Sequence, residues 1–533
     1  MKHPIRRRNW IQLALAQAAG ALGCCAWAQE EVALDFNPFK LGIASGQPTS
    51  SSVVLWTRLL PANPFSNPWG NRAVTVSWEL AHDDKFGRVI QQGNVSALAE
   101  LAHSVHLEVL NLQADQIYYY RFRVGGMYSP VGRTRTLPDA TATNTPLKLA
   151  FASCQRYHSG TFDAYDFMLA DNPDLVVFLG DYIYEGGAGM GESRGKPLKP
   201  AFKLSDYREL YELARSDPSL ANMHAACPWL ILWDDHEVTN DYAGGEVRAG
   251  LDKGSLAKLM AMGFQAWYEH MPVSPRVLKD GVEGLLKNGT ELKLYETFSW
   301  GRLADLHLLD TRQYRSRQVG CGFAGLFEPK DCTDYNNPAR SMLGETQEAW
   351  LLNQLQKAGE TKSGASWNLI CQPLVFTRLL FPVGAGRVNQ DNWDGYPVSR
   401  ERILKACVEH QTKNPVIFGG DIHQNWASHV HTDPLTMQGP VVMPEFCSTS
   451  IATPSFGPLS AKEMKDLAPH CIYTDRHLRG YGLVELTAST MRVDFRVVGR
   501  NSEGSSQISS AATFTVKSGS PMISVTQATP LGK

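Results

Sequence analysis

The sequence lacks both long hydrophobic runs and an excess of positive charge, and each absence excludes a class of protein. Beyond the N-terminal segment no apolar run reaches about 18 residues, which excludes a multi-span membrane protein and predicts no membrane span in the mature chain. The 51 Lys and Arg residues nearly balance the 53 Asp and Glu residues, and the pI is about 6.7. This balance gives no indication of a nucleic-acid-binding surface. We find no internal repeat.

Cysteine is scarce, with ten residues in a chain of 533. Cys24 and Cys25 lie in an N-terminal segment that we expect to be removed, so eight remain in the mature protein. In an oxidising compartment, the loop "CGFAGLFEPKDC" predicts a disulfide between Cys321 and Cys332. Spacing does not decide the other pairings. Cys154 is expected to stay outside any disulfide, because it follows a strand that we expect at a metal site.

Residues 1–28 have the features of an export signal. A cluster of arginines precedes a short Ala-rich apolar stretch, and Ala26-Trp27-Ala28 fits a cleavage site near Ala28. The arginine pair before Asn9 resembles a twin-arginine signal, which predicts an interaction with the twin-arginine export machinery and a periplasmic or secreted protein. A general secretion signal and a lipoprotein site at Cys24 are the alternatives. Removal of this segment leaves 47 basic and 53 acidic residues, a formal charge of −6.

The rest of the chain divides into two predicted domains. Residues 36–137 contain short Val-, Tyr- and Trp-rich runs separated by turn residues, which predicts an all-β sandwich of the immunoglobulin or fibronectin kind. A linker follows at 138–146. Residues 147–518 alternate apolar strands with segments of helical periodicity, as in an α/β (α+β) catalytic domain, and end in a predicted hairpin. The helical segments are "DAYDFMLADNP", "GSLAKLMAMGFQAWYEHM" and "GETQEAWLLNQLQKA". Residues 519–533 are predicted to form a loose tail.

Four apolar strands of the second domain end in side chains that bind metals. Their sequences are "FASCQ", "FLGDYIYE", "LWDDHEVTND" and "FGGDIHQNW". In an open α/β sheet, sites form outside the carboxyl ends of the strands, so we expect these groups to meet at one edge. The groups are Cys154, Asp181, Tyr184, Asp234, Asp235, His236, Glu237, Asn240, Asp421 and His423.

Each of these residues alone has an ordinary structural explanation. A cysteine after a strand is usually packed in the core, an Asp after Gly usually forms a turn, and a tyrosine usually packs. The joint occurrence of all four groups, in this order and after an export signal, favours a metal site. Tyr184 is unusual, because many two-metal phosphatases have a second acid at this place, three residues after the first Asp.

The four motifs together resemble the PhoD-like alkaline phosphatases, relatives of the calcineurin-like and purple acid metallophosphatases. "FKLGIASGQPTSSSVVLWTRL" resembles the N-terminal β domain of that family, and "LLDTRQYR" resembles another of its signatures. The resemblance extends from about Phe36 to Val498. It implies a metallophosphatase sandwich fold and the hydrolysis of small phosphate esters.

The resemblance also implies a centre of Fe³⁺ with neighbouring Ca²⁺, and this explains the tyrosine. Phenolate is a hard anionic ligand suited to Fe³⁺, and a nearby cation lowers the pKa of a phenol or a thiol. The implied metal ligands are Cys154, Asp181, Tyr184, Asp235, Asn240 and Asp421. His423 and His236 are implied to bind phosphate or donate a proton. Arg312 is a candidate for phosphate binding, or for a structural pair with Asp310.

Other functions remain open at this stage. "GESRG" matches a nucleophile elbow that would make Ser193 the nucleophile of a serine hydrolase, but no strand precedes it and prolines follow. A second alternative is a binding protein that keeps the fold but has lost the catalytic activity. Within the enzymes, a phosphodiesterase or phospholipase remains possible, as does a purple-acid-type iron–zinc or iron–manganese site. That last site would require histidines where this chain has Cys154 and Asp421.

Overall fold

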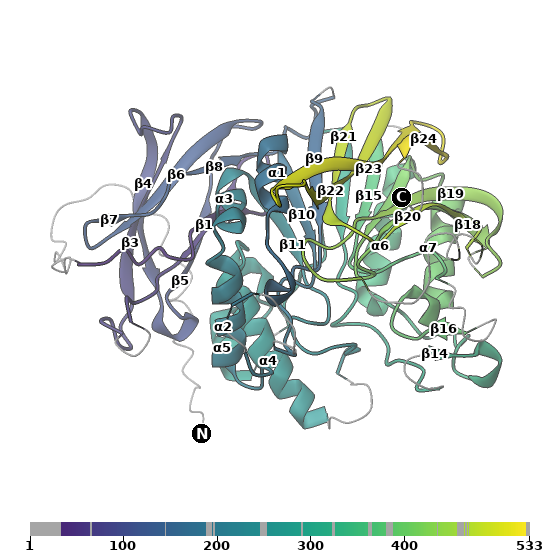
Figure 1. Ribbon diagram of the computed structural model, residues 1–533, viewed down its shortest axis with the longest axis horizontal. Coiled ribbons are helices and arrows are strands. Elements are labelled where there is room, and N and C mark those ends of the chain that lie inside the picture. The colour runs from purple at the N-terminus through teal and green to yellow at the C-terminus, as the bar shows by residue number, and fades with distance from the viewer. Residues whose placement is uncertain are drawn as a thin grey trace, which may run out of the picture.

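Two large β-sheets packed face to face form the centre of the molecule (Figure 1). The computed structural model describes residues 34–63, 67–143, 145–187, 194–195, 198–245, 253–288, 291–321, 326–360, 365–379, 387–433, 435–455, 463, 466 and 468–528. The predicted signal at 1–28 and Ser193 lie outside these residues. No helix of the described residues is long and apolar enough to cross a membrane.

The N-terminal domain is a β-sandwich, as predicted for 36–137. One of its sheets has the order β4-β3-β6-β7, with β8 also paired to β6. The other contains β1, β2 and β5. The strands are β1 (Ile43–Gly46), β2 (Val53–Arg58), β3 (Val74–Ala81), β4 (Val89–Ala97), β5 (Ser104–Val109), β6 (Ile117–Val124), β7 (Met127–Tyr128) and β8 (Gly132–Arg135). Val76, Leu80 and Phe122 fill the space between the two sheets.

This domain is joined to the rest of the molecule by its backbone. Strand β1 pairs in parallel with β11 (Pro228–Leu232), so that Ser45 lies opposite Pro228 and Gly46 opposite Trp229. One sheet of the sandwich is therefore the end of a ten-stranded sheet with the order β24-β23-β22-β21-β9-β10-β11-β1-β2-β5. The sequence predicted a separate domain followed by a linker, and this shared sheet was not expected.

The centre of the ten-stranded sheet consists of parallel strands with buried apolar residues. They are β9 (Leu147–Ala152), β10 (Leu175–Leu179) and β11, and every residue of β10 and β11 is buried. Beside them lie β21 (Arg479–Leu486), β22 (Thr490–Arg500), β23 (Ser506–Lys517) and β24 (Ile523–Ala528). The predicted closing hairpin is confirmed as β21 and β22, which are antiparallel neighbours.

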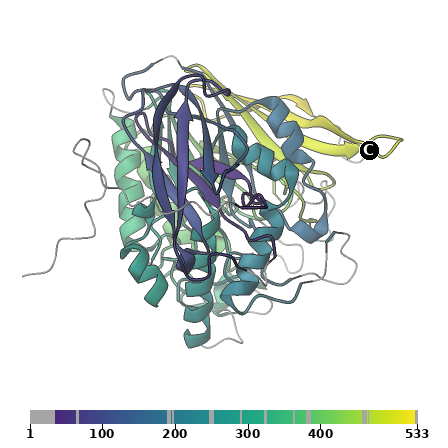
Figure 2. The ribbon, with the colours of Figure 1, turned by 90° about the vertical axis from the view of Figure 1, so that its left-hand side faces the viewer.

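The prediction of a loose tail at 519–533 was wrong for its first part. Residues 523–528 form β24, which pairs with β23 along the edge of the sheet, at the far end of Figure 2 from the N-terminal strands. Only Ile523 of this strand is buried, so the sequence shows little of the alternation that marks a half-buried strand. The unpaired N–H and C=O groups of β23 at the edge of the sheet form hydrogen bonds with this segment. These backbone bonds make it a strand, although its side-chain pattern does not predict one.

The second sheet has the order β12-β13-β15-β17-β19-β18-β20. Its strands are β12 (Glu296–Trp300), β13 (Ala304–Leu308), β15 (Trp367–Cys371), β17 (Pro415–Gly419), β18 (Asn425–Asp433), β19 (Gln438–Cys447) and β20 (Cys471–Asp475). The small pair β14 (Leu326–Phe327) and β16 (Val388–Asn389) lies apart. Phe151 of the first sheet packs on Phe418 of the second, with ring centroids 4.7 Å apart. The main apolar core therefore lies between the sheets.

Helices cover the outer faces of both sheets (Figure 1). They are α1 (Ala164–Asp171), α2 (Leu204–Arg215), α3 (Pro218–Ala226), α4 (Lys253–His270), α5 (Gly281–Asn288), α6 (Gly344–Gly359) and α7 (Pro397–Glu409). The helical periodicity predicted α1, α4 and α6. The predicted disulfide between Cys321 and Cys332 is present, and Cys154 is a free, buried thiol, as expected.

Candidate metal centre

The four predicted strand ends meet at one place, between the two sheets. Cys154 follows β9, Asp181 follows β10 and Asp234 follows β11, all in the ten-stranded sheet. Asp421 and His423 follow β17, which belongs to the other sheet. The expectation of a single sheet edge was therefore wrong in this respect. The residues meet because the carboxyl ends of two facing sheets are close together.

The backbone is left-handed at four of these residues. Cys154, Asp181, Asp421 and His423 have φ values of 59°, 58°, 66° and 52°. Such values are uncommon for residues other than glycine, and strained conformations cluster at functional sites. Gly180 also has a positive φ of 108°, and a Cβ atom there would lie 2.6 Å from the backbone nitrogen of Asp234. The turn after β10 is therefore pressed directly against the turn after β11.

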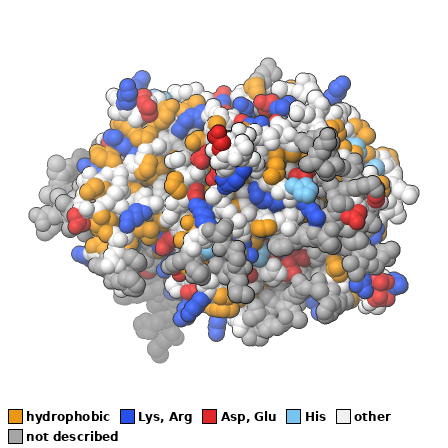
Figure 3. All heavy atoms as spheres, in the orientation of Figure 1, with side chains coloured by type: hydrophobic (Ala, Val, Ile, Leu, Met, Phe, Trp, Pro, Cys, Tyr) orange, Lys and Arg blue, Asp and Glu red, His pale blue; other side chains and the backbone are white. Residues whose placement is uncertain are grey.

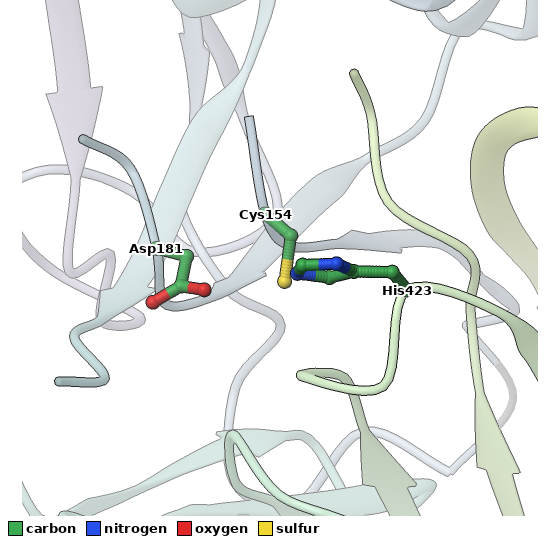
Figure 4. Close-up of side chains that lie close together, drawn as sticks. All are labelled: Cys154, Asp181 and His423. Carbon is green, nitrogen blue, oxygen red and sulfur yellow. The ribbon is translucent and has the colours of Figure 1, made fainter. Parts of the chain in front are cut away.

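Cys154, Asp181 and His423 form the first group of possible ligands. Their ligand atoms lie within 4.8 Å of one another, and all three side chains are buried. In Figure 4 the carboxylate of Asp181 and the ring of His423 point toward the sulfur of Cys154 from opposite sides. One thiol, one carboxylate and one imidazole therefore face a common point.

Tyr184 lies in the same group, which answers the question raised by its place in the motif. Its hydroxyl donates a hydrogen bond to Asp181 at 2.9 Å and lies 3.1 Å from Nε2 of His423. The hydroxyl of Thr453 lies 3.0 Å from the same phenol oxygen. The side chain is only 6% exposed. The phenol oxygen is therefore directed into the site.

His423 has a defined tautomer. Its Nδ1 lies 2.8 Å from the backbone carbonyl of Pro454, an acceptor, so Nδ1 carries the proton. Burial lowers the pKa of His423 to about 3, so the ring is neutral. Nε2 then presents a lone pair to Tyr184 and Cys154. This arrangement suits a metal ligand or a hydrogen-bond acceptor, whereas the sequence predicted a phosphate-binding or proton-donating group.

His236 has the opposite character. Its Nδ1 lies 2.6 Å from the carboxylate of Glu185, and its ring centroid lies 4.2 Å from that of Tyr184. Burial opposes the charged form, but Asp235, Asp181 and Glu185 together hold the pKa of His236 well above its usual range. The side chain remains 21% exposed. His236 is thus a protonated ring at the accessible side of the cluster.

A second group of possible ligands contains Asp181, Asp235 and His236, and a third contains Asp235, Asp241 and Asp391. Within each group the ligand atoms lie within 4.8 Å of one another. Asp181 and Asp235 each belong to two groups, so the groups are continuous. Sequence reasoning missed Asp241, although it directly follows Asn240, and Asp391, which lies in no recognised motif.

Two predicted ligands lie less centrally. Asn240 is exposed, and the contact that fixes it is a bond from its backbone N–H to Glu185 at 2.8 Å. Asp421 is half-buried and belongs to none of the three groups. Burial and the neighbouring Asp234 and Asp235 raise the pKa of Asp421 well above its usual range, so it lies within the electrostatic field of the cluster.

Glu237 and Arg312 hold the two turns together. The buried carboxylate of Glu237 accepts hydrogen bonds from the backbone N–H groups of Asp181, Tyr182 and Asp234. Arg312 is fully buried, contacts the carboxylate of Asp234, and donates to Asp391 at 2.9 Å. Its third nitrogen lies 3.9 Å from Asp235. Arg312 therefore has a structural role, because its guanidinium forms ion pairs with Asp234 and Asp391. The predicted structural partner, Asp310, forms no ion pair with it.

The electrostatics of this cluster fit a bound cation. Burial and the repulsion of neighbouring acids raise the pKa of Asp181 to about 8 and hold those of Asp234 and Asp421 well above their usual range. Burial and the nearby Asp181 likewise raise the pKa values of Cys154 and Tyr184. One carboxylate oxygen of Asp181 is buried without a partner among the described residues. A cation would reverse these shifts by stabilising the ionised groups.

Comparison with known proteins places this cluster in a family. The model of the PhoD-like phosphatase family matches residues 149–495, and that of the PhoD-like phosphatase N-terminal domain matches residues 25–138. The chain belongs to the PhoD-like phosphatase family. It is 37% identical to alkaline phosphatase D of Bacillus subtilis (strain 168) over 515 residues, which is 95% of this chain and 84% of that protein.

A solved structure of PhoD shares the fold of this PhoD-like chain. The two superpose with a TM-score of 0.83 at 36% identity, over 94% of each chain. The predicted fold class, a metallophosphatase domain with an N-terminal all-β domain, is therefore confirmed. Cys154, Asp181 and His423 lie within residues 149–495, the range that the family model matches.

Proposed function

We propose that this PhoD-like phosphatase is an exported, metal-dependent enzyme that hydrolyses phosphate esters at the cluster between its two sheets. The observation that carries the proposal is the cluster itself. Six aspartate carboxylates, a thiol and a phenol lie together, and burial and mutual repulsion raise the pKa values of several of them, which a bound cation would lower again. Membership of a phosphatase family fits the same chemistry.

We propose that Fe³⁺ is held by Cys154, Asp181 and Tyr184, with Nε2 of His423 available as a further ligand. Calcium suits the oxygen-rich side, where Asp235, Asp241 and Asp391 lie together, with Asp421 and Asn240 nearby. When bound, the metal ions supply an activated oxygen nucleophile and neutralise the charge of the phosphoryl group.

The residues of the chain have separate tasks in this proposal. His236, whose Nδ1 lies 2.6 Å from the carboxylate of Glu185, donates a hydrogen bond or a proton from Nε2 to the oxygen of the leaving group. Glu237 and Arg312 fix the turns that carry Asp181 and Asp234, which keeps the ligand geometry in place. His423 acts through its lone pair, so the transferable proton is assigned to His236.

The experiment that tests the proposal combines metal analysis with activity. The mature protein should contain iron and calcium, show a visible charge-transfer band, and hydrolyse p-nitrophenyl phosphate. Tyr184→Phe should lose the band and most of the activity. Tyr182→Phe is the matched control, because its hydroxyl faces His224 at 2.9 Å and should leave the band intact. A colourless protein without iron would refute the iron assignment.

The same assay tests the preference for substrates. Bis-p-nitrophenyl phosphate, a diester, is compared with the monoester under identical conditions. A higher kcat/KM for the diester would identify the enzyme as a phosphodiesterase on this fold. Activity that resists chelation but disappears with a serine-directed phosphonate would instead favour Ser193 as the nucleophile.

We also propose that the protein is exported to the periplasm, or secreted, through the twin-arginine pathway. The support is the arginine pair before Asn9 and the cleavage site near Ala28. Replacement of Arg7 and Arg8 by lysine should retain the full-length precursor in the cytoplasm. Cell fractionation measures this, and export of the variant at the normal rate would contradict the proposal.

A further inference from the structure

Arg215 is a buried cation between the two domains, and it belongs to none of the three groups of possible metal ligands. It is the last residue of α2, and its side chain is fully buried. Its guanidinium lies over the indole ring of Trp56, with 4.1 Å between the guanidinium carbon and the ring centroid. Helix α3 contacts β1, where the N-terminal strands meet the central sheet, and α2 contacts α3 (Figure 1).

The guanidinium of Arg215 has no counter-charge. In the described part of the chain no carboxylate forms an ion pair with it, and its one hydrogen-bonding neighbour is the neutral hydroxyl of Tyr182. Two nearby arginines, in contrast, have a carboxylate partner: Arg58 pairs with Glu212 at 2.8 Å, and Arg208 pairs with Glu269. These acids are therefore already matched by other cations.

Other buried polar atoms lie on the elements that meet at this junction. The hydroxyl of Tyr211 and Nδ1 of His224 have no partner among the described residues, and the hydroxyls of Ser45 and Tyr120 have only each other. Tyr211 and Arg215 are four residues apart in α2 and thus share one face of the helix. Burial is the largest cause that lowers the pKa of His224, and the positive charge of Arg215 is the second. The ring of His224 is therefore neutral.

An uncompensated charge in this position is costly. Burying a charge without a partner costs more free energy than a single desolvated cation–π contact returns. The contact with Trp56 therefore compensates only part of the cost. The hydroxyl groups and the guanidinium all have hydrogens to donate, so the group that satisfies them together is an acceptor with negative charge.

We propose that a small monovalent anion of the halide class, chloride under physiological conditions, is bound beside Arg215 at the junction of the two domains. Its ligands are the guanidinium of Arg215 and the hydroxyls of Ser45, Tyr120 and Tyr211. A single charge matches the single unpaired cation, because the surrounding side chains are neutral and fully buried. A phosphate dianion would leave an unpaired negative charge.

The site requires both domains. Ser45, Trp56 and Tyr120 come from β1, β2 and β6, whereas Tyr211 and Arg215 come from α2 of the catalytic domain. Because these elements meet only in the folded protein, the anion binds the native state and not the unfolded chain. It therefore stabilises the junction in proportion to its concentration.

Crystals of the metal-loaded mature protein grown in sodium bromide test the proposal directly. Bromide has a strong anomalous signal, and we expect a peak within hydrogen-bond distance of the Arg215 guanidinium. The Arg215→Met variant should lack this peak. Density for water alone at this place in the wild type would overturn the proposal, since the site would then hold only solvent.

Thermal unfolding provides a second test that does not depend on crystals. At constant ionic strength, replacement of gluconate by chloride should raise the Tm of the wild type by about 2–3 °C at a hundredfold excess over the dissociation constant. Arg215→Met should lose this response. Arg133→Met is the matched control, because Arg133 lies at the same junction but donates to the carbonyl of Ala226, and it should keep the response. An equal response in all three proteins would contradict specific binding.

Discussion

At the residue scale, the candidate centre depends on side chains whose backbone is strained and whose charges repel one another. Cys154, Asp181, Asp421 and His423 all have positive φ values, and the acids have raised pKa values. Such a site persists only if neighbouring residues hold it. The hydrogen bonds of Thr453, Glu237 and Arg312 supply this support.

Thr453 links the turns that carry Cys154 and Tyr184. Its buried hydroxyl donates to the carbonyl of Cys154 at 2.7 Å and accepts from the backbone N–H of Arg156 at 3.0 Å. Thr453→Val keeps the shape but leaves the N–H unpaired, so we expect a loss of about 1–3 kcal/mol in the free energy of unfolding. Urea denaturation measures this. Thr453→Ser retains the hydroxyl and should unfold near the wild-type midpoint; an equal loss in both variants would point to the methyl group instead.

Variants of Arg312 distinguish a structural role of this side chain from a role in substrate binding. Its removal leaves the buried carboxylates of Asp234 and Asp391 without their cation, so Arg312→Met should lose about 3–5 kcal/mol of stability. Arg312→Lys should recover only part of it, because a lysine lacks the planar fork that reaches both acids. Denaturation and steady-state kinetics are measured together. Unchanged stability with a raised KM would assign Arg312 to substrate binding, as the sequence had suggested.

At the element scale, the parallel pairing of β1 with β11 joins the two domains. Gly46 makes this approach possible, because a Cβ atom there would lie 2.2 Å from the carbonyl oxygen of Pro272 and 2.8 Å from that of Trp229. Both are backbone atoms, which cannot move aside independently. The sandwich domain is therefore attached through a close contact that tolerates only glycine.

Gly46→Ala should reduce the free energy of unfolding by about 3 kcal/mol, since it forces β1 away from β11. Gly87→Ala is the control: Gly87 is exposed, and its nearest neighbour to an added Cβ lies at an ordinary 3.6 Å. That variant should stay within about 0.5 kcal/mol of the wild type. Chemical denaturation compares the two proteins. A Gly46→Ala variant as stable as the control would show that the strands can separate freely.

At the scale of the whole molecule, the junction of the domains predicts sensitivity to acid. His106 of β5 is half-buried and stacks on Tyr268 of α4, with ring centroids 4.1 Å apart, and its Nδ1 lies 3.0 Å from the carbonyl of Val273. Burial lowers the pKa of His106 to about 4, below its usual 6.5. The unfolded chain therefore takes up a proton in this window, while the folded protein does not.

Stability should then fall as the pH decreases from about 6.5 to about 4, with no further contribution from His106 below that. One proton corresponds to about 1.4 kcal/mol per pH unit, and the full contribution is about 3 kcal/mol. His106→Phe removes this proton, so its stability should depend less steeply on pH by that amount. Urea midpoints measured from pH 7 to pH 4 provide the test. Parallel curves for the two proteins would show that His106 is already protonated when folded.

Much of the molecule could be predicted from local sequence. Buried parallel strands carry continuous apolar residues, so β9, β10, β11 and β17 were visible, and the polar residues after them marked the candidate centre. Helical periodicity marked α4 and α6, and the spacing of Cys321 and Cys332 marked the disulfide. These features depend on near neighbours in the chain, which the sequence displays directly.

Only the tertiary structure decided which of these elements lie together. The sequence contained no sign that β17 belongs to a different sheet from β9, or that β1 extends the catalytic sheet, because strand pairing joins residues far apart in the chain. For the same reason Asp391 and Arg215 were invisible as members of sites. Their charge is a property of the sequence, but its burial and its partners, or lack of them, are set by elements that the fold brings together.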